Sequence, residues 1–412
     1  MKYEKYKDSR IDWIGEIPEH WEINKGKHIY KITTGKLDAN EYDEGGKYPF
    51  FTCSNENTWI NTYAFDCEAL LISGNGNVGF TRYYKGKFNA YQRVYVLYNF
   101  SENIDSDYLK YYTSSRLIPS VAKKSVGSVI EFIKLGDIKN FSICFPTKEE
   151  QNKIASYLDN KTAKIDAIIN SLEDQRDKLE RYKRELISET VTKGLKKNVS
   201  MKDSGVDWIG EIPEHWQIFP LFHLLKENKE KNAGMINSNL LSLSYGRIIK
   251  KDIDTTFGLL PASFEGYQIV DKDYIILRLT DLQNDKRSLR TGIVREKGII
   301  TSAYVGLKKS PIESNSEYLH YVLHAYDLKK VFYSMGSGLR QSLNFSDIKR
   351  IPLLFPPIDE QEKIVRTLNL KQQKIDSIKK KIKLQIEELK DYRKIIIYDA
   401  VTGKKKVFGG ED

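Results

Sequence analysis

The stretch DWIGEIPEHW occurs twice in this chain, at residues 12–21 and at 207–216. Two further pairs of similar blocks lie 210 positions apart: FPTKEEQNKI (145–154) with FPPIDEQEKI (355–364), and TVTKG (190–194) with AVTGK (400–404). Similarity that recurs at a nearly constant offset is the signature of a repeated structural unit. The chain is therefore a tandem duplication, and its fold must build one scaffold twice.

The regions between the shared blocks, 24–144 and 219–354, have few letters in common. Both contain runs rich in Val, Ile and Tyr, such as RVYVLYNF and DYIILRL, which are typical of β-strands. We therefore predict an α/β (α+β) protein with two globular heads of diverged surface. The predicted division is an N-terminal conserved segment (1–23), head 1 (24–146), a central helix (147–193), a linker with the second DWIGEIPEHW copy (194–218), head 2 (219–356), a C-terminal helix (357–404) and a tail (405–412).

Each head is followed by more than 40 residues without Pro or Gly, in which apolar residues recur every seven positions. A second row is expected three positions beyond the first, interrupted by Lys161 and Gln175 in one copy and by Lys371 and Gln385 in the other. This periodicity predicts a coiled coil. The predicted seam consists of Ile154, Leu158, Ile165, Ile168, Leu172, Leu179, Tyr182 and Leu186 in the central helix, and of Ile364, Leu368, Ile375, Ile378, Ile382, Leu389, Tyr392 and Ile396 in the C-terminal helix.

We expect the two helices to pair antiparallel and to separate the heads, which gives a dumbbell with pseudo-two-fold symmetry. The end of the second repeat, VTGKKKVF, then lies close to the N-terminal segment KYKDSRIDWIG. The alternative is a pair of unrelated surface helices that each pack on their own head. In the dumbbell, DWIGEIPEHW is scaffold, and its tryptophans fasten each head to a helix end or to a partner that binds twice: Trp13, Trp21, Trp208 and Trp216.

The net charge of +10 is concentrated in the heads. Region 24–144 has 15 basic and 12 acidic residues, and region 219–354 has 20 and 14. Ordinary solvated surface accounts for an excess of this size, but a basic excess on two heads related by a dyad favours two half-sites of double-stranded DNA. No run approaches the roughly 18 apolar residues of a membrane span. Three cysteines without metal-ligand spacing fit a cytoplasmic protein.

The stretch SGNGNVGFT at 73–81 contains both a G-x-G-x-x-G pattern and a P-loop skeleton. Phe80 occupies the P-loop lysine position, and the TRYYKGKF that follows reads as a strand rather than a helix. A nucleotide site needs the helix N-terminus at this place. We therefore predict a glycine-rich hairpin, whose backbone could approach a DNA phosphate.

The duplicated DWIGEIPEHW, and the FP-x-x-x-EQ-x-KI block before each long helix, bracket two variable regions. This combination resembles the specificity subunit of type I restriction–modification systems, over the whole chain. The resemblance implies two target-recognition domains, each reading one half of a bipartite DNA site, and a helical spacer that sets their spacing. It also implies that two methyltransferase subunits and restriction subunits assemble around this chain. S-adenosylmethionine, ATP and Mg²⁺ are then cofactors of those partners, and this chain has none.

Two other classes of protein are weighed against this reading. A stand-alone enzyme with a fused recognition arm would need an [ND]PP[YF] tetrapeptide or a complete Walker A site, and the sequence has only FPPI at 355–358. A purely structural coiled-coil scaffold would not need two diverged basic heads. No other reactive groups accompany Glu16, Glu19 and His20, so we predict no catalytic set there. The i,i+4 pair His320 and His324 has no cysteine cluster nearby, and we assign it to a helix surface rather than to a metal.

The candidates for DNA contact are long polar side chains near the glycine turns. Arg and Gln can bind guanine and adenine edges with two hydrogen bonds, whereas Lys mostly contacts phosphates. The candidates are Arg82, Lys85, Lys87, Gln92, Arg93, Lys123, Lys124 and Ser128 in head 1, and Arg278, Arg287, Arg290, Arg295, Ser337, Arg340 and Gln341 in head 2.

Overall fold

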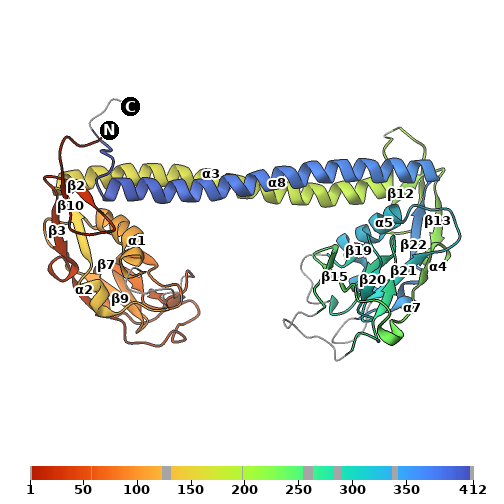
Figure 1. Ribbon diagram of the computed structural model, residues 1–412, viewed down its shortest axis with the longest axis horizontal. Coiled ribbons are helices and arrows are strands. Elements are labelled where there is room, and N and C mark those ends of the chain that lie inside the picture. Colours follow the sequence, from red (N-terminus) through yellow and green to blue (C-terminus); the bar gives the residue numbers. More distant parts are fainter. Residues whose placement is uncertain are drawn as a thin grey trace. The chain divides into compact units, whose positions relative to one another are not determined.

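The computed structural model describes residues 2–56, 58–122, 131–196, 198–253, 263–282, 289–335 and 342–408. The chain divides into two compact units: unit 1 comprises Met1–Glu173 and Lys383–Asp412, and unit 2 comprises Asp174–Ile382. Each unit contains one head and a part of each of two long helices, α3 (Lys148–Lys193) and α8 (Ile358–Val401) (Figure 1). The two long helices predicted from the seven-residue pattern are confirmed.

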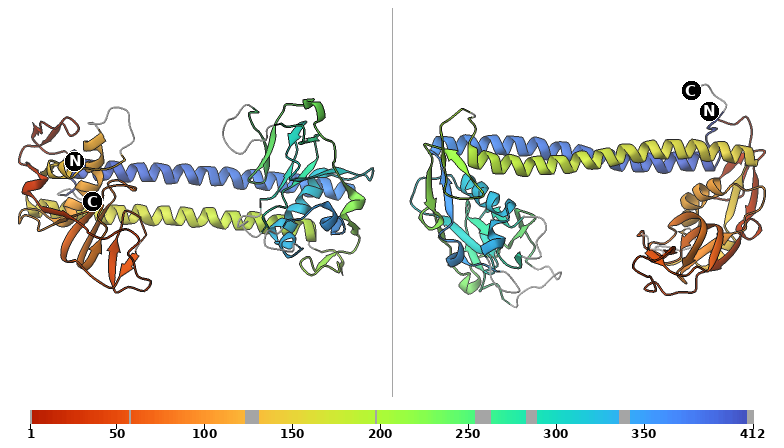
Figure 2. Two further views of the ribbon diagram at one scale, coloured as in Figure 1. Left: turned by 90° about the horizontal axis from the view of Figure 1, so that it is seen from below. Right: turned by 180° about the vertical axis from the view of Figure 1, so that it is seen from behind.

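Head 1 is built on a six-stranded sheet in the order β4-β9-β7-β8-β5-β6. All neighbouring strands are antiparallel except β5 and β8, which run parallel. Helix α1 (Ser106–Ala122) lies between this sheet and α3 (Figure 1, Figure 2). The strands are β4 (Lys31–Thr34), β5 (Tyr48–Phe51), β6 (Thr58–Ile60), β7 (Phe65–Ser73), β8 (Thr81–Ala90) and β9 (Val94–Tyr98).

The four-stranded sheet of head 2, ordered β14-β21-β18-β19, corresponds to β4-β9-β7-β8 of head 1. Even one backbone contact is repeated, because Ile133 N donates to Gly74 O at 2.9 Å and Leu343 N donates to Leu279 O at 2.8 Å. In place of β5 and β6, head 2 has two separate strand pairs, β15–β16 and β17–β20, and its helix α5 (Ser316–Leu328) corresponds to α1. The strands are β14 (Leu225–Glu227), β15 (Leu241–Ser244), β16 (Arg247–Lys250), β17 (Gln268–Val270), β18 (Ile275–Leu277), β19 (Thr291–Ile293), β20 (Gly298–Ile300) and β21 (Val305–Lys309).

The repeated decapeptide folds in the same way in both copies. β1 (Tyr6–Asp8) pairs with β2 (Glu16–Pro18), and β11 (Met201–Asp203) pairs with β12 (Glu211–Pro213) in the equivalent register. The strand after each copy pairs with the last strand of its head, β3 (Glu22–Lys25) with β10 (Ser142–Phe145) and β13 (Gln217–Pro220) with β22 (Pro352–Phe355). The remaining short elements are η1 (Gly26–His28), α2 (Leu135–Lys139), α4 (Leu221–Leu224), η2 (Ala233–Met235), α6 (Val331–Met335) and α7 (Phe345–Ile348).

Trp21 and Trp216 end the two copies of the decapeptide, and both are completely buried. Trp21 Nε1 donates a hydrogen bond to Glu150 in the first turn of α3 at 3.3 Å, and Trp216 Nε1 donates to Glu360 in the first turn of α8 at 3.2 Å. The histidine before each tryptophan lies 2.8 Å from the same carboxylate. The decapeptide therefore fastens each head to the start of the long helix that follows it.

The glutamine after each of these glutamates is also fully buried. Gln151 and Gln361 accept hydrogen bonds from the backbone amides of Asp105 and Asn315, at 2.8 and 2.9 Å, just before the head helices α1 and α5. Each glutamine also donates to the carbonyl of a proline that precedes its long helix, at 2.8 and 2.9 Å. The EQ dipeptide thus joins the long helix to two other parts of the unit. Its glutamate binds the decapeptide, and its glutamine binds the head.

In unit 1 the C-terminal segment contacts the first decapeptide. In unit 2 the end of α3 makes the same kind of contact with the second decapeptide, which follows it in the chain. Lys404 Nζ donates to Glu16 O at 2.7 Å, and Lys193 Nζ donates to the equivalent Glu211 O at 2.6 Å. Tyr6 Oη donates to Gly403 O at 3.2 Å. The expectation that the end of the second repeat lies beside the N-terminal segment is confirmed.

The seam between the long helices differs in part from the prediction. The first row is buried or half-buried throughout, and Ile154 and Ile364 are buried at the junctions. The prediction was wrong for Ile168, Tyr182, Ile378 and Tyr392, whose exposed fractions are 50%, 50%, 46% and 51%. The second row lies four positions beyond the first, as at Thr162, Ile169 and Lys183 and at Gln372, Lys379, Ile386 and Arg393. Steps of three and four alternate along a coiled-coil seam, so a row with a spacing of seven leaves both choices open.

The helix segments within each unit run antiparallel (Figure 1), and ion pairs join them. In unit 1, Arg393 on α8 lies 3.1 Å from Asp166 on α3. In unit 2, Lys183 on α3 lies 3.0 Å from Asp376 on α8. An offset of 210 converts Asp166 into Asp376 and Lys183 into Arg393, so the duplication carries one ion pair into both units.

Candidate nucleic-acid interface

The glycine-rich stretch of head 1 connects β7 to β8, which pair antiparallel from Phe65↔Phe88 to Ile72↔Thr81. Gly76 and Gly79 have positive φ values of 61° and 79°, a backbone conformation that glycine adopts without strain. A strand follows the loop and no helix begins there, so the predicted hairpin is confirmed. The loop therefore cannot present a helix N-terminus to a nucleotide.

Arg82 lies beside this loop, but its guanidinium turns inward. It stacks 5.0 Å from the ring centre of Phe51 and 5.2 Å from that of Phe80, and it donates to the Thr52 carbonyl. Burial lowers the pKa of the guanidinium. Arg82 therefore stabilises the hairpin from inside, and the structure does not offer it to a base edge.

Lys85 and Lys87 are exposed at the other end of the hairpin, away from the glycine loop. Each stands opposite an acidic residue of β7, with Lys85 facing Glu68 and Lys87 facing Asp66. The Lys87 ammonium also lies 4.7 Å from the ring centre of Tyr63. These lysines are free to reach a phosphate, but the opposite carboxylates reduce the local positive potential.

Gln92 and Arg93 are brought together with the glycine loop. Both are exposed, and Gly74 N donates to Arg93 O at 2.8 Å. With Lys134 and Phe132 they line a groove of about 480 Å³ in head 1. The groove thus combines a guanidinium, an amide, an ammonium and an exposed aromatic ring. These are groups that bind bases and phosphates.

Lys134 and Phe132 were missed by the sequence analysis. Phe132 is 52% exposed, and the Lys134 ammonium lies 5.8 Å from its ring centre. Ile133, between them, is buried and its amide donates to Gly74 O, which turns its two neighbours outward beside the loop. The alternation of exposed, buried and exposed residues in FIK was the available signal.

In head 2 the structure separates the candidates. Arg278 is exposed, and Arg295 is exposed but paired with Glu317. Arg290 is only 7% exposed, and its guanidinium donates to backbone carbonyls that include Asp281 O at 2.7 Å. Arg290 therefore braces the loop after β18, and its guanidinium is not available to DNA in this conformation.

Seven candidates lie outside the described residues, so the structure does not place them. They are Lys123, Lys124 and Ser128 in head 1, and Arg287, Ser337, Arg340 and Gln341 in head 2.

Unit 2 contains a hollow of about 740 Å³ between α5, the β15–β16 hairpin and the long helices. Several cations line it, but they are paired: Lys183 and Arg247 lie 3.0 and 3.5 Å from Asp376, and Lys379 is paired with Glu180. Because carboxylates pair with these cations, we assign no anion site to the hollow.

His320 and His324 also line this hollow, so their predicted assignment to an outer helix surface was wrong. Their rings are nearly parallel, with centres 6.1 Å apart, and Thr291 Oγ1 lies 3.1 Å from His324 Nδ1. Burial lowers the pKa of His320 to about 4 and that of His324 to about 3. Within the part of the chain that the structure describes, no three His, Cys, Asp or Glu side chains are grouped to hold a metal.

The long helices of the described ranges are too polar to serve as membrane spans, and no other described helix qualifies.

Known proteins resemble this chain over nearly its whole length. The family described as "Type I restriction modification DNA specificity domain" matches residues 18–176 and 268–388. The chain is 26% identical over 419 residues to the type I restriction enzyme EcoDI specificity subunit of Escherichia coli. The aligned region covers 95% of this chain and 90% of the relative. It is 24% identical over 443 residues to the putative type I restriction enzyme MjaX specificity subunit of Methanocaldococcus jannaschii, with 99% of each chain covered.

Two solved structures have a similar fold. One, described as "Structural basis underlying complex assembly and conformational transition of the type I R-M system", contains a chain with a TM-score of 0.66 and 13% identity, covering 93% of this chain and 98% of that one. The other, the HsdS subunit from Thermoanaerobacter tengcongensis, has a TM-score of 0.50 and 13% identity, with 94% and 98% covered.

Proposed function

The chain belongs to the family of type I restriction modification DNA specificity domains, and from this premise we propose how its two heads read DNA. Each head recognises one half of a bipartite site in double-stranded DNA. The heads deliver the methyltransferase subunits of a type I complex to that site. The chain supplies sequence recognition, and its partners supply the chemistry.

The observation that carries this proposal is that the two units attach different heads to their long helices through the same contacts. The same Trp–Glu and Gln–backbone contacts hold both heads, and four corresponding strands lie in both sheets. Beyond those strands the heads differ in sequence and in topology. A protein whose two parts read different DNA sequences needs this combination of constant attachment and variable surface.

In head 1, we assign DNA contact to the groove formed by Gln92, Arg93, Phe132 and Lys134 and to the exposed lysines Lys85 and Lys87. In head 2 the exposed Arg278 is the corresponding described candidate. Arginine and glutamine are suited to base edges and lysine to phosphates. The inward guanidiniums of Arg82 and Arg290 support the two heads from inside.

We also propose that two methyltransferase subunits dock on the long helices and that restriction subunits join the complex. Exposed apolar residues repeat on the two helices as Ile168 with Ile378 and Tyr182 with Tyr392. The repeat offers the same apolar surface twice, which suits two copies of one partner. S-adenosylmethionine, ATP and Mg²⁺ are bound by the partners, and the complex acts in the cytoplasm, where it meets DNA.

The first prediction is that the isolated chain neither methylates nor cleaves DNA. Purified chain is incubated with DNA, S-adenosylmethionine, ATP and Mg²⁺, and methyl incorporation and strand breaks are measured. We expect both to equal a mock preparation, with methylation restored when the methyltransferase subunit is added. Methylation or cleavage by the chain alone would contradict the proposed division of labour.

A further inference from the structure

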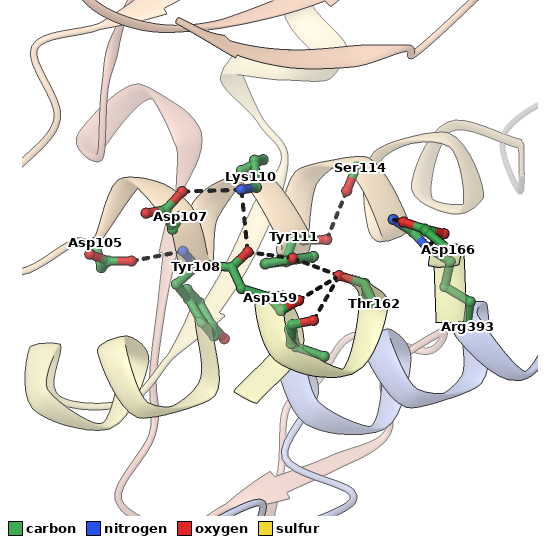
Figure 3. A network of polar contacts seen from close by, with 11 residues as sticks. Asp105, Asp107, Tyr108, Lys110, Tyr111, Ser114, Asp159, Thr162, Asp166 and Arg393 are labelled. Carbon is green, nitrogen blue, oxygen red and sulfur yellow. Dashed lines mark hydrogen bonds and ion pairs between the residues drawn. The ribbon is translucent and has the colours of Figure 1, made fainter. Parts of the chain in front are cut away.

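Helix α1 of head 1 is fastened to α3 by a tyrosine hydroxyl. Tyr111 is buried, and its hydroxyl donates to Asp159 at 2.6 Å and lies 3.1 Å from Thr162 Oγ1 (Figure 3). The Lys110 ammonium lies 3.8 Å from the same Asp159 carboxylate and 3.1 Å from Asp107. Burial and the Asp159 hydrogen bond raise the pKa of Tyr111 to about 12, so the hydroxyl remains a donor at neutral pH.

Head 2 has the same fastening at the positions 210 residues later. Tyr321 on α5 is buried, and its hydroxyl donates to Asn369 Oδ1 at 2.5 Å and accepts a hydrogen bond from Gln372 Nε2 at 2.7 Å. Asn369 and Gln372 correspond to Asp159 and Thr162. The two units therefore conserve the tyrosine and its place, while its partners change from an ionic group to neutral amides.

The tyrosine is one of two polar attachments that both units repeat between the head helix and the long helix. The other is the buried glutamine, Gln151 or Gln361, in the first turn of the long helix. The tyrosine partner lies eight residues further along, at Asp159 or Asn369, which is about 12 Å along the helix axis. Two polar attachments about 12 Å apart add a directional constraint to the apolar packing and so restrict the angle between the helices.

We infer that Tyr111 and Tyr321 are positioning residues for DNA recognition, because each sets the angle at which its head presents its reading surface to DNA. The inference rests on the proposed function and deepens it. A head of this size is about 30 Å across, so a rotation of about 5° moves its far side by about 3 Å. That displacement is close to the rise of one base pair, about 3.4 Å. The tyrosines therefore decide how strictly the complex selects the spacing between its half-sites.

The test uses the complete complex of the full chain with its methyltransferase subunits. Methylation rates are measured on DNA with the native spacer and with a spacer one base pair longer or shorter, and the ratio of the rates defines spacer selectivity. Tyr111→Phe removes only the hydroxyl. We expect it to lower selectivity about tenfold, because its bond is charge-assisted, and Tyr321→Phe to lower it about threefold.

Tyr112→Phe is the matched control for head 1. Tyr112 lies on the same helix and is buried, but its hydroxyl donates to Ser142 O within the head at 3.0 Å. Tyr326→Phe serves head 2 in the same way, since its hydroxyl donates to the Pro352 carbonyl. We expect both controls to keep the wild-type selectivity, even where they lower thermal stability.

If Tyr111→Phe and Tyr112→Phe change selectivity equally, or if Tyr111→Phe leaves it unchanged, the tyrosine has no positioning role. If Tyr111→Phe folds poorly, Asp159→Ala replaces it, because this change keeps the tyrosine ring and removes the carboxylate that accepts the hydroxyl hydrogen bond. It should also lower selectivity, and unchanged selectivity would overturn the inference. A wild-type complex that methylates all three spacers equally would overturn the proposed function as well.

Discussion

Two histidines make the stability of head 2 depend on pH. Burial holds the pKa of His320 near 4 and that of His324 near 3, and for His324 the neighbouring His320 lowers the pKa further. In an unfolded chain both histidines have a pKa of about 6.5. The unfolded state therefore binds protons below pH 6.5 that the folded state does not bind until about pH 4. Stability that is present above pH 6.5 is lost as the pH falls through this window.

The second prediction is that the free energy of opening α5 falls by on the order of 1 kcal/mol per histidine between pH 7 and pH 5. Amide hydrogen exchange, corrected for its intrinsic pH dependence, measures this quantity. Helix α1 is the internal control, since it has Lys110 and Ser114 where α5 has the two histidines. A His320→Gln/His324→Gln variant should lose the effect. Equal behaviour of α1 and α5 would contradict the assignment.

Individual residues also show where sequence reasoning succeeds. Strand alternation separates Arg82 from Lys85 and Lys87, because Arg82, Tyr84 and Phe88 share the face of β8 that packs on Phe51. Lys85 and Lys87 lie on the other face and are exposed. That signal was present in TRYYKGKF and predicts which cations can meet DNA. No comparable signal marks Arg290, whose burial depends on carbonyls of a loop up to 12 residues away.

At the scale of elements, the sequence predicts the two long helices and the first row of their seam. It does not determine the second row. Absence of Pro and Gly and a spacing of seven determine that a helix forms and which row is buried. The choice between +3 and +4 for the second row depends on the partner helix. There, Lys183 and Arg393 reach carboxylates while Ile168 and Tyr182 remain exposed.

The third prediction compares two adjacent isoleucines of α3 in the isolated chain. Ile169 is 7% exposed and Ile168 is 50% exposed. Ile169→Asp should lower the free energy of unfolding by about 3 kcal/mol, because it buries a charge in the seam, whereas Ile168→Asp should cost less than about 1 kcal/mol. Chemical denaturation measures both. A larger loss for Ile168→Asp would restore the originally predicted seam.

The fourth prediction concerns helix length. One added heptad after Gln175 and one after Gln385 preserve the seam and add about 10 Å of helix. At about 3.4 Å per base pair, the unspecified spacer between the methylated half-sites should grow by up to about three base pairs. A heptad in only one helix should abolish activity, because it shifts one helix along the other and separates the residues that form the ion pairs between them. An active double insertion with the original spacer would show that the helices do not set the spacing.

At the scale of the whole molecule, the duplication was the most informative feature of the sequence. It predicted two heads, two helices and a common junction, since the conserved blocks are those that contact one another. It could not predict the base contacts. The contacts that we propose involve residues such as Arg93 and Lys134, which lie where the two repeats differ and where a loop far along the chain completes the groove.

The central claim is that each head reads its own half-site, and a head exchange tests it most directly. Residues 219–354 are replaced by the same region of another family member, which keeps both junctions, and adenine methylation is mapped across the host genome. We predict, as the fifth prediction, that the half-site read by head 2 changes while the half-site read by head 1 stays the same. A change in both half-sites, or in neither, would contradict separate recognition by the two heads.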